Sequence, residues 1–172
     1  MSATMVSMNH TLSTRPATTP PGAALAGASD FTGQLLHAAD ITDEHVLGQR
    51  VGLIGTGARA ILLLPRLVAE AQKVTVFQRT PRWILPSWPF GRVNPLSPAP
   101  EAYTGKPLLR AWAQQRARMH LKRSISERWL RRQLTPQEPF SARPALISAE
   151  WYALLQQPSV KLITWPIIRL CP

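Results

Sequence analysis

The clearest pattern of apolar and polar positions lies between Val51 and Arg79. Val51–Ile54 is a short, continuously apolar run, typical of a strand buried in a parallel sheet. Downstream, small and apolar residues recur at the spacing of one helix face: Ala60, Leu64, Leu67 and Ala71. Pro65 lies within this helix, removes one hydrogen bond and predicts a bend. A second apolar run, Val74–Phe77, follows at the distance a parallel crossover requires. The pattern therefore predicts a βαβ unit in an α/β protein.

A glycine turn joins the first strand to the helix and has the pattern G-x-G-x-x-A. Gly55 and Gly57 favour a tight turn with a backbone bare enough for a diphosphate to approach, and Ala60 keeps helix and strand close. The following helix directs its free N–H groups and positive dipole end to the same place. The turn predicts a Rossmann-like dinucleotide site, with an ordinary βαβ turn as the alternative. The candidate coenzyme-binding residues here are Gly55, Thr56, Gly57, Ala58, Arg59 and Ala60.

The end of the second strand favours NADPH over NADH. An NAD site usually places Asp or Glu there, to accept hydrogen bonds from the ribose 2′-hydroxyl. This sequence has Gln78, Arg79 and Thr80 instead, so no carboxylate repels a 2′-phosphate, and Arg79 can pair with one. The alternative is that Arg79 is a solvated surface charge.

The flanking segments predict less regular structure. Residues 1–29, rich in Ser, Thr, Ala and Pro, resemble a linker, and residues 30–40 lead into a polar turn. Residues 81–107 hold seven prolines, which predicts an extended loop carrying Trp83, Trp88 and Phe90.

The C-terminal half predicts a helical segment, a short helix and a last strand. Residues 108–133 form a basic helical insertion, in which Leu121, Ile125 and Trp129 are spaced by four and predict an apolar stripe. Ser148 can cap a short helix over 149–157. Residues 160–164 predict a last strand, and we expect the βαβ unit to have few further strands beside it.

Charge is the unusual feature of the composition. The 172 residues carry a formal net charge of +11, and residues 106–132 contain nine Lys or Arg against one acid, Glu127. Such a cluster fits nucleic acid, an anionic membrane surface, a solvated helix face, or a fragment whose acidic complement lies elsewhere. The apolar stripe favours docking onto protein, so we expect no nucleic-acid partner.

The cysteine and histidine content and the hydropathy argue against a disulfide-bonded, metal-binding, membrane-spanning or secreted protein. The single cysteine, Cys171, precludes an internal disulfide, and the four histidines are scattered, so we expect no metal site. Neither a membrane-spanning run nor a secretion signal is evident, which predicts a cytoplasmic protein.

Three segments resemble the flavin-dependent Baeyer–Villiger monooxygenases and related flavin-containing monooxygenases. Phe31–Asp40 resembles the family's F-x-G-x-x-x-H-x-x-x-W fingerprint, and Val76–Trp83 resembles its V-F-Q-R-T-P-x-W segment. Leu134–Val160 resembles the stretch leading to the last strand of the family's NADPH domain. The resemblance covers about residues 12–170, in the family's order and spacing.

The resemblance implies an NADPH- and FAD-dependent monooxygenase. In that family NADPH reduces FAD, and a peroxyflavin inserts oxygen into a ketone or oxidises a heteroatom. It implies that Arg79 and Thr80 contact the NADP phosphate and that His37 belongs to a hinge. Arg143 matches either member of a Lys-Arg pair that holds negative charge on NADP or on the flavin. Residues 1–29 would be a remnant of the FAD-domain edge, and residues 30–172 a partial NADPH-binding domain.

The sequence also departs from the family pattern. The fingerprint's closing Trp is missing after Asp40, Arg59 replaces a common Ser and could contact or crowd a phosphate, and Pro144 matches neither member of the Lys-Arg pair. The FAD-binding G-x-G-x-x-G of the family is not found. We therefore expect part of a larger enzyme that does not turn over alone. A stand-alone NADPH-binding or regulatory module, or a basic surface binder, remains open.

Overall fold

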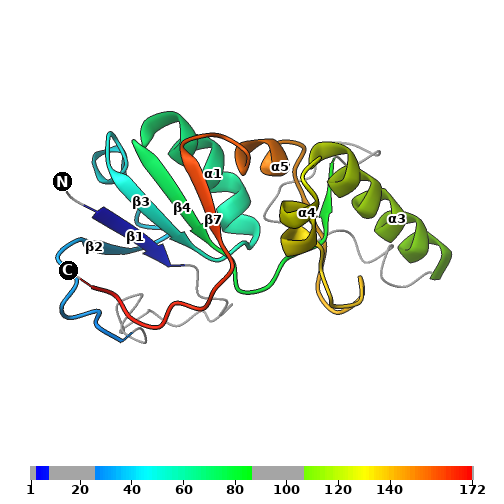
Figure 1. Ribbon diagram of the computed structural model, residues 1–172, viewed down its shortest axis with the longest axis horizontal. Coiled ribbons are helices and arrows are strands. Elements are labelled where there is room, and N and C mark those ends of the chain that lie inside the picture. Colours follow the sequence, from blue (N-terminus) through cyan, green and yellow to red (C-terminus); the bar gives the residue numbers. More distant parts are fainter. Residues whose placement is uncertain (1–2, 8–25, 87–106, 172) are drawn as a thin grey trace.

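The computed structural model describes residues 3–7, 26–86 and 107–171 (Figure 1). Its elements are β1 (Ala3–Ser7), β2 (Gln34–His37), a 3₁₀ helix (Asp43–His45), β3 (Arg50–Ile54), α1 (Ala58–Glu70), β4 (Lys73–Phe77), β5 (Ile84–Leu85), α3 (Pro107–Ser124), α4 (Arg128–Leu134), β6 (Leu146–Ile147), α5 (Trp151–Leu154) and β7 (Val160–Ile163). This is the α/β fold that the apolar pattern predicts.

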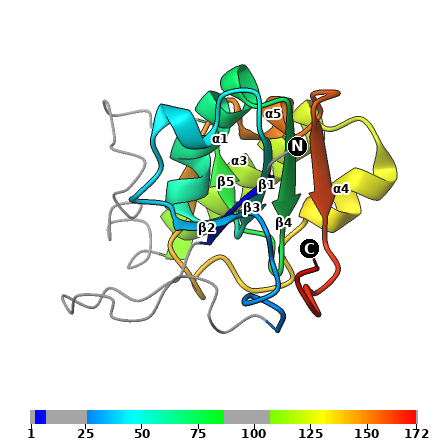
Figure 2. The same cartoon turned by 90° about the vertical axis from the view of Figure 1, so that its left-hand side faces the viewer.

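The main layer is a parallel five-stranded sheet in the order β2-β1-β3-β4-β7. All four strand pairs are parallel, so the carboxyl ends of the strands share one edge. α1 lies against one face of this sheet, as Figures 1 and 2 show. The main core is formed mostly by alternate strand residues, α1 and the neighbouring helices, and includes Val51, Leu53, Val74, Val76, Leu64 and Leu67.

The predicted βαβ unit is confirmed at residue level. Ala60, Leu64 and Leu67 are buried, Ala71 packs against the same core, and α1 runs through Pro65 without ending. Helix and strand therefore bury the faces that their apolar spacing indicates.

Two expectations for the N-terminal region and the sheet are wrong. Ala3–Ser7 is not a linker but β1, the strand between β2 and β3, where Met5 pairs with Gly52. A side chain at position 52 would collide with the Met5 sulfur, so glycine here leaves room for the Met5 side chain. With five strands the βαβ unit also has neighbours on both sides. Composition missed β1 because its five residues are too few to offset the polar, proline-rich segment around them; residues 8–25 lie outside the described part.

A second, smaller layer carries the helical segment. β5 and β6 pair in parallel, and α3 packs beside β5 (Figure 1). Its core contains Trp83, Leu85, Ala113, Ala117, Phe140 and Ala145, with the Trp83 and Phe140 rings 5.9 Å apart. The expected loop over 81–107 is therefore wrong for β5, while Trp88 and Phe90 lie outside the described residues.

The expected helical segment at 108–133 is confirmed as two helices, and the single apolar stripe is wrong. The chain leaves the helix after Ser124 and re-enters one at Arg128. Leu121 and Ile125 are buried, but Trp129 is 56% exposed, because the break between the helices turns it away.

The last elements are close to the prediction. The Ser148 hydroxyl accepts a hydrogen bond from the Trp151 N–H at 3.1 Å, as a cap would, although the helix that follows is shorter than expected. β7 is the predicted last strand and pairs with β4.

His120 makes the stability of this arrangement sensitive to pH. Its Nε2 lies 3.1 Å from the Ser148 carbonyl oxygen and its Nδ1 3.3 Å from the Ser124 hydroxyl, so Nε2 donates and Nδ1 accepts. Burial lowers the pKa of His120; the Ser148 carbonyl raises it, and the charge of Arg116 lowers it.

We predict that the free energy of unfolding falls as pH drops below about 6.5, the usual pKa of histidine. The unfolded chain takes up the proton there, whereas the folded chain does so only at lower pH, so the loss is about 1.4 kcal/mol per pH unit between the two pKa values. Urea unfolding of the wild type and of His120→Gln between about pH 7.5 and 5 measures this, and the variant should show a shallower fall. Identical profiles for the two proteins would contradict the prediction.

Candidate functional site

The glycine turn lies at the carboxyl edge of the sheet, between β3 and α1. Gly55 has φ 106°, a conformation that residues with a side chain rarely adopt, and its N–H donates to the Phe77 carbonyl at 2.9 Å. Gly57 is buried and precedes α1 with an ordinary φ of −82°, so its lack of a side chain is not required by the backbone. No side chain caps α1. Ala58 and Ala60 follow in its first turn, so the turn presents bare backbone at the start of the helix.

Thr56 ties this turn to the segment after β4. Thr56 is buried, and its hydroxyl donates to the Thr80 carbonyl at 3.2 Å. The two halves of the predicted dinucleotide site, at residues 55–60 and 78–80, are therefore held together.

Of the residues after β4, the structure leaves Arg79 accessible and buries Gln78. The Gln78 side chain donates to the Gln133 carbonyl at 2.9 Å, and its backbone N–H donates to Ile163 at 2.8 Å. Gln78 thus joins β4 to α4 and β7. Arg79 is exposed, and an exposed guanidinium is free to meet a phosphate from solvent.

The structure brings His37 and Arg59 together at the carboxyl edge of the sheet. His37 ends β2 and Arg59 lies in the first turn of α1; Arg59 Nη1 is 3.1 Å from His37 Nε2 and 3.5 Å from Nδ1. β1 lies between β2 and β3, so this contact joins α1 to a strand that is not a direct neighbour of β3 in the sheet. Sequence reasoning treated the two residues separately; the signal that joins them is that parallel strands end at a common edge.

Arg143 lies in a different cluster. Its guanidinium donates to the Glu138 carboxylate at 3.0 Å, while Arg82 donates to the Pro144 carbonyl at 2.6 Å. Burial lowers the pKa of Arg82, the charge of Arg143 lowers it further, and Glu138 raises it. None of the contacts described for Arg143 reaches the glycine turn.

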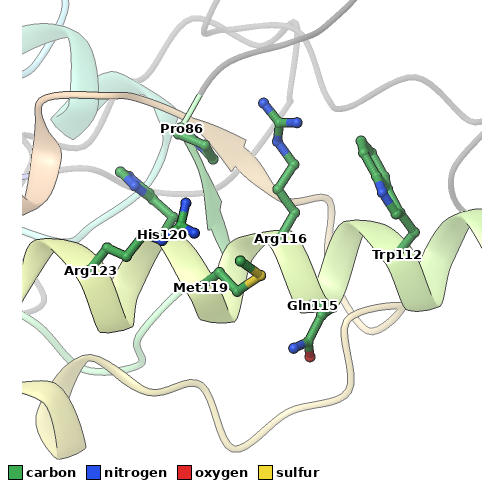
Figure 3. A pocket seen from close by; sticks show the side chains of 7 residues that line it. All are labelled: Pro86, Trp112, Gln115, Arg116, Met119, His120 and Arg123. Atoms are coloured by element: carbon green, nitrogen blue, oxygen red, sulfur yellow. The ribbon is translucent and has the colours of Figure 1, made fainter.

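A cavity of about 480 Å³ opens beside α3 (Figure 3). Side chains of α3 form most of its wall, and Pro86, the residue after β5, completes it. The lining residues are Pro86, Trp112, Gln115, Arg116, Met119, His120 and Arg123. None of these was predicted as a site residue, because their spacing in sequence indicates only a helix.

Two further findings concern the described residues. The helices among them lack the length and the hydrophobicity that a membrane-spanning helix needs. Within the same part of the chain, no three His, Cys, Asp or Glu side chains gather as metal ligands would.

Comparison with known proteins finds sequence similarity to monooxygenases. No protein-family model matches the chain. A Baeyer–Villiger monooxygenase of Streptomyces coelicolor is 28% identical over 173 residues, covering 87% of this chain and 33% of that protein. An FAD-binding monooxygenase of Aspergillus niger is 32% identical over 181 residues, covering 88% and 29%.

Solved structures agree on the fold. Cyclohexanone monooxygenase from Rhodococcus, bound to NADP⁺, superposes with a TM-score of 0.64 at 20% identity, over 81% of this chain and 37% of that one. Steroid monooxygenase bound to NADP gives 0.63 at 20% identity, over 86% and 38%. The chain has the α/β fold of one part of these enzymes.

The chain is homologous to a portion of the flavin-dependent Baeyer–Villiger monooxygenases, as its motifs predict. It spans about a third of the length of the curated relatives that it matches.

The conformation of Gly55 gives a direct test of the turn. We predict that Gly55→Ala lowers the free energy of unfolding by about 1–2 kcal/mol, because alanine is strained at this φ. Gly48→Ala is the matched control: Gly48 also has positive φ, 67°, but lies before β3 with open space around it. Chemical denaturation should show a loss in both variants, and a Gly55→Ala protein as stable as wild type would contradict the turn described.

Proposed function

We propose that this chain is the NADPH-binding part of an FAD-dependent monooxygenase. The supporting observation is the glycine turn: Gly55 at φ 106°, Gly57 buried and α1 uncapped, all at the carboxyl edge of a parallel sheet. A diphosphate at this place accepts hydrogen bonds from the first-turn amides of α1 and is favoured by the helix dipole.

The residues present fit NADPH. Bare backbone at the turn leaves room for the diphosphate, and the exposed Arg79 can pair with a 2′-phosphate where an NAD site would have a carboxylate. The solved structures of cyclohexanone monooxygenase and steroid monooxygenase, which share this fold, are bound to NADP, and this supports the same coenzyme.

The sequence fits FAD less well than it fits NADPH. The 172 residues hold one glycine turn of the dinucleotide-binding kind, and our proposal assigns that turn to NADPH. FAD supplies the oxygen chemistry in the homologous enzymes, so we expect this chain to bind NADPH without oxidising it. Oxygen insertion into a ketone, or oxidation of a heteroatom, is proposed only for an enzyme in which this part meets a flavin site.

Coenzyme titration tests the proposal. We predict saturable binding of NADPH by the chain, and Arg79→Ala should weaken it about tenfold or more because one charge-assisted pair is lost. NADH, which lacks the 2′-phosphate, should bind the two proteins alike. Isothermal titration calorimetry or quenching of protein fluorescence measures both affinities.

The matched control is Lys73→Ala. Lys73 starts β4, so this variant removes the same charge at the opposite edge of the sheet and should leave both affinities unchanged. Gly57→Val, which places a side chain in the approach to α1, should abolish binding of both coenzymes. NADPH binding that survives Gly57→Val, or an equal loss for both coenzymes in Arg79→Ala, would reject this mode of binding.

A further inference from the structure

Arg59 sits at an electrostatically unfavourable position. It lies in the first turn of α1, at the positive end of the helix dipole, and that turn contains no acidic residue. A positive side chain there is disfavoured unless an anion joins it.

Other charges on the same helix are compensated within the protein. Arg66 pairs with both Asp43 and Glu70. Arg59, among the described residues, forms no ion pair, and its contacts are with the His37 ring.

The histidine holds the arginine without neutralising it. Arg59 Nη1 lies 3.1 Å from His37 Nε2 and 3.5 Å from Nδ1, and the Ala39 N–H donates to Nδ1 at 3.3 Å. These contacts hold the imidazole ring and the guanidinium beside each other. An imidazole ring carries no negative charge, so its contact leaves the charge of Arg59 without a counter-ion beside the glycine turn.

We propose that His37 positions Arg59 to bind the diphosphate of the coenzyme. This rests on the proposed function and assigns a second cationic group to the same site. Arg59 is carried by the helix turn whose amides face the diphosphate, whereas Arg79 follows β4, where the ribose of the adenosine lies in such sites. The two arginines therefore serve different anionic groups of one molecule.

Because the two arginines serve different anionic groups, their alanine variants should change the affinities for NADPH and NADH differently. NADPH and NADH share the diphosphate, so Arg59→Ala should weaken both about tenfold, in contrast to the NADPH-selective effect of Arg79→Ala. Arg66→Ala is the control on the same helix: it removes an equal charge from a residue that already has carboxylate partners, and both affinities should stay within about twofold of wild type.

Variants of His37 separate positioning from packing. His37→Phe keeps a ring but offers no acceptor, and should weaken both coenzymes about fivefold. His37→Gln retains an acceptor oxygen and should restore most of this loss. In an Arg59→Ala background His37→Phe should have no further effect, a non-additivity that a purely structural role would not produce. Thermal unfolding of each variant checks that the fold is kept.

Three results decide the proposal. Equal losses for NADPH and NADH in Arg59→Ala, with rescue by His37→Gln, support it. Unchanged or tighter binding in Arg59→Ala, while Arg79→Ala remains NADPH-selective, overturns it and leaves the proposed function standing; tighter binding would mean that Arg59 obstructs the turn. If the wild-type chain binds neither coenzyme, the proposed function fails and this inference fails with it.

Discussion

The shared carboxyl edge of the parallel strands is the constraint on which this structure depends. β3 ends there, Gly55 reverses the chain at φ 106°, and α1 starts with its uncapped amides facing the same edge. The Gly55 N–H also bonds the Phe77 carbonyl at the end of β4, so the turn is fixed to the neighbouring strand. This backbone geometry is the basis of the proposed anion site, and the neighbouring side chains are the basis for proposing NADPH as its ligand.

Buried polar bonds connect this edge to the helical layer. Gln78 donates to Gln133 in α4, and within the helical layer itself the Trp83 indole donates to the Glu138 carbonyl at 3.0 Å. Each bond contributes about 1 kcal/mol net, but leaving such a buried group unpaired costs more, about 1–3 kcal/mol. These hydrogen bonds therefore favour one fixed position of the helical layer against the sheet.

Part of the large positive charge has a structural use. Lys122 and Arg123 lie in the last turn of α3, where the helix dipole favours cations. Arg131 reaches back from α4 and donates to the carbonyls of Ile125 and Ser126, at 2.7–3.0 Å, in the break between the two helices. These three side chains therefore stabilise the end of α3 and the break between α3 and α4.

How much the sequence determined depends on the range of each interaction. The βαβ unit, the glycine turn and the strand at 160–163 follow from local periodicity and turn chemistry, so Val51–Arg79 could be predicted almost residue by residue. β1 and β5 could not: β5 has two residues, β1 borders a polar, proline-rich segment, and each becomes a strand only because a distant strand supplies its hydrogen-bond partners. The sequence alone marked Arg59, His37, Gln78 and Arg79 as candidates. Only the tertiary structure brought Arg59 and His37 together, buried Gln78 and left Arg79 exposed. These outcomes depend on the order of the strands in the sheet, which no local sequence pattern records.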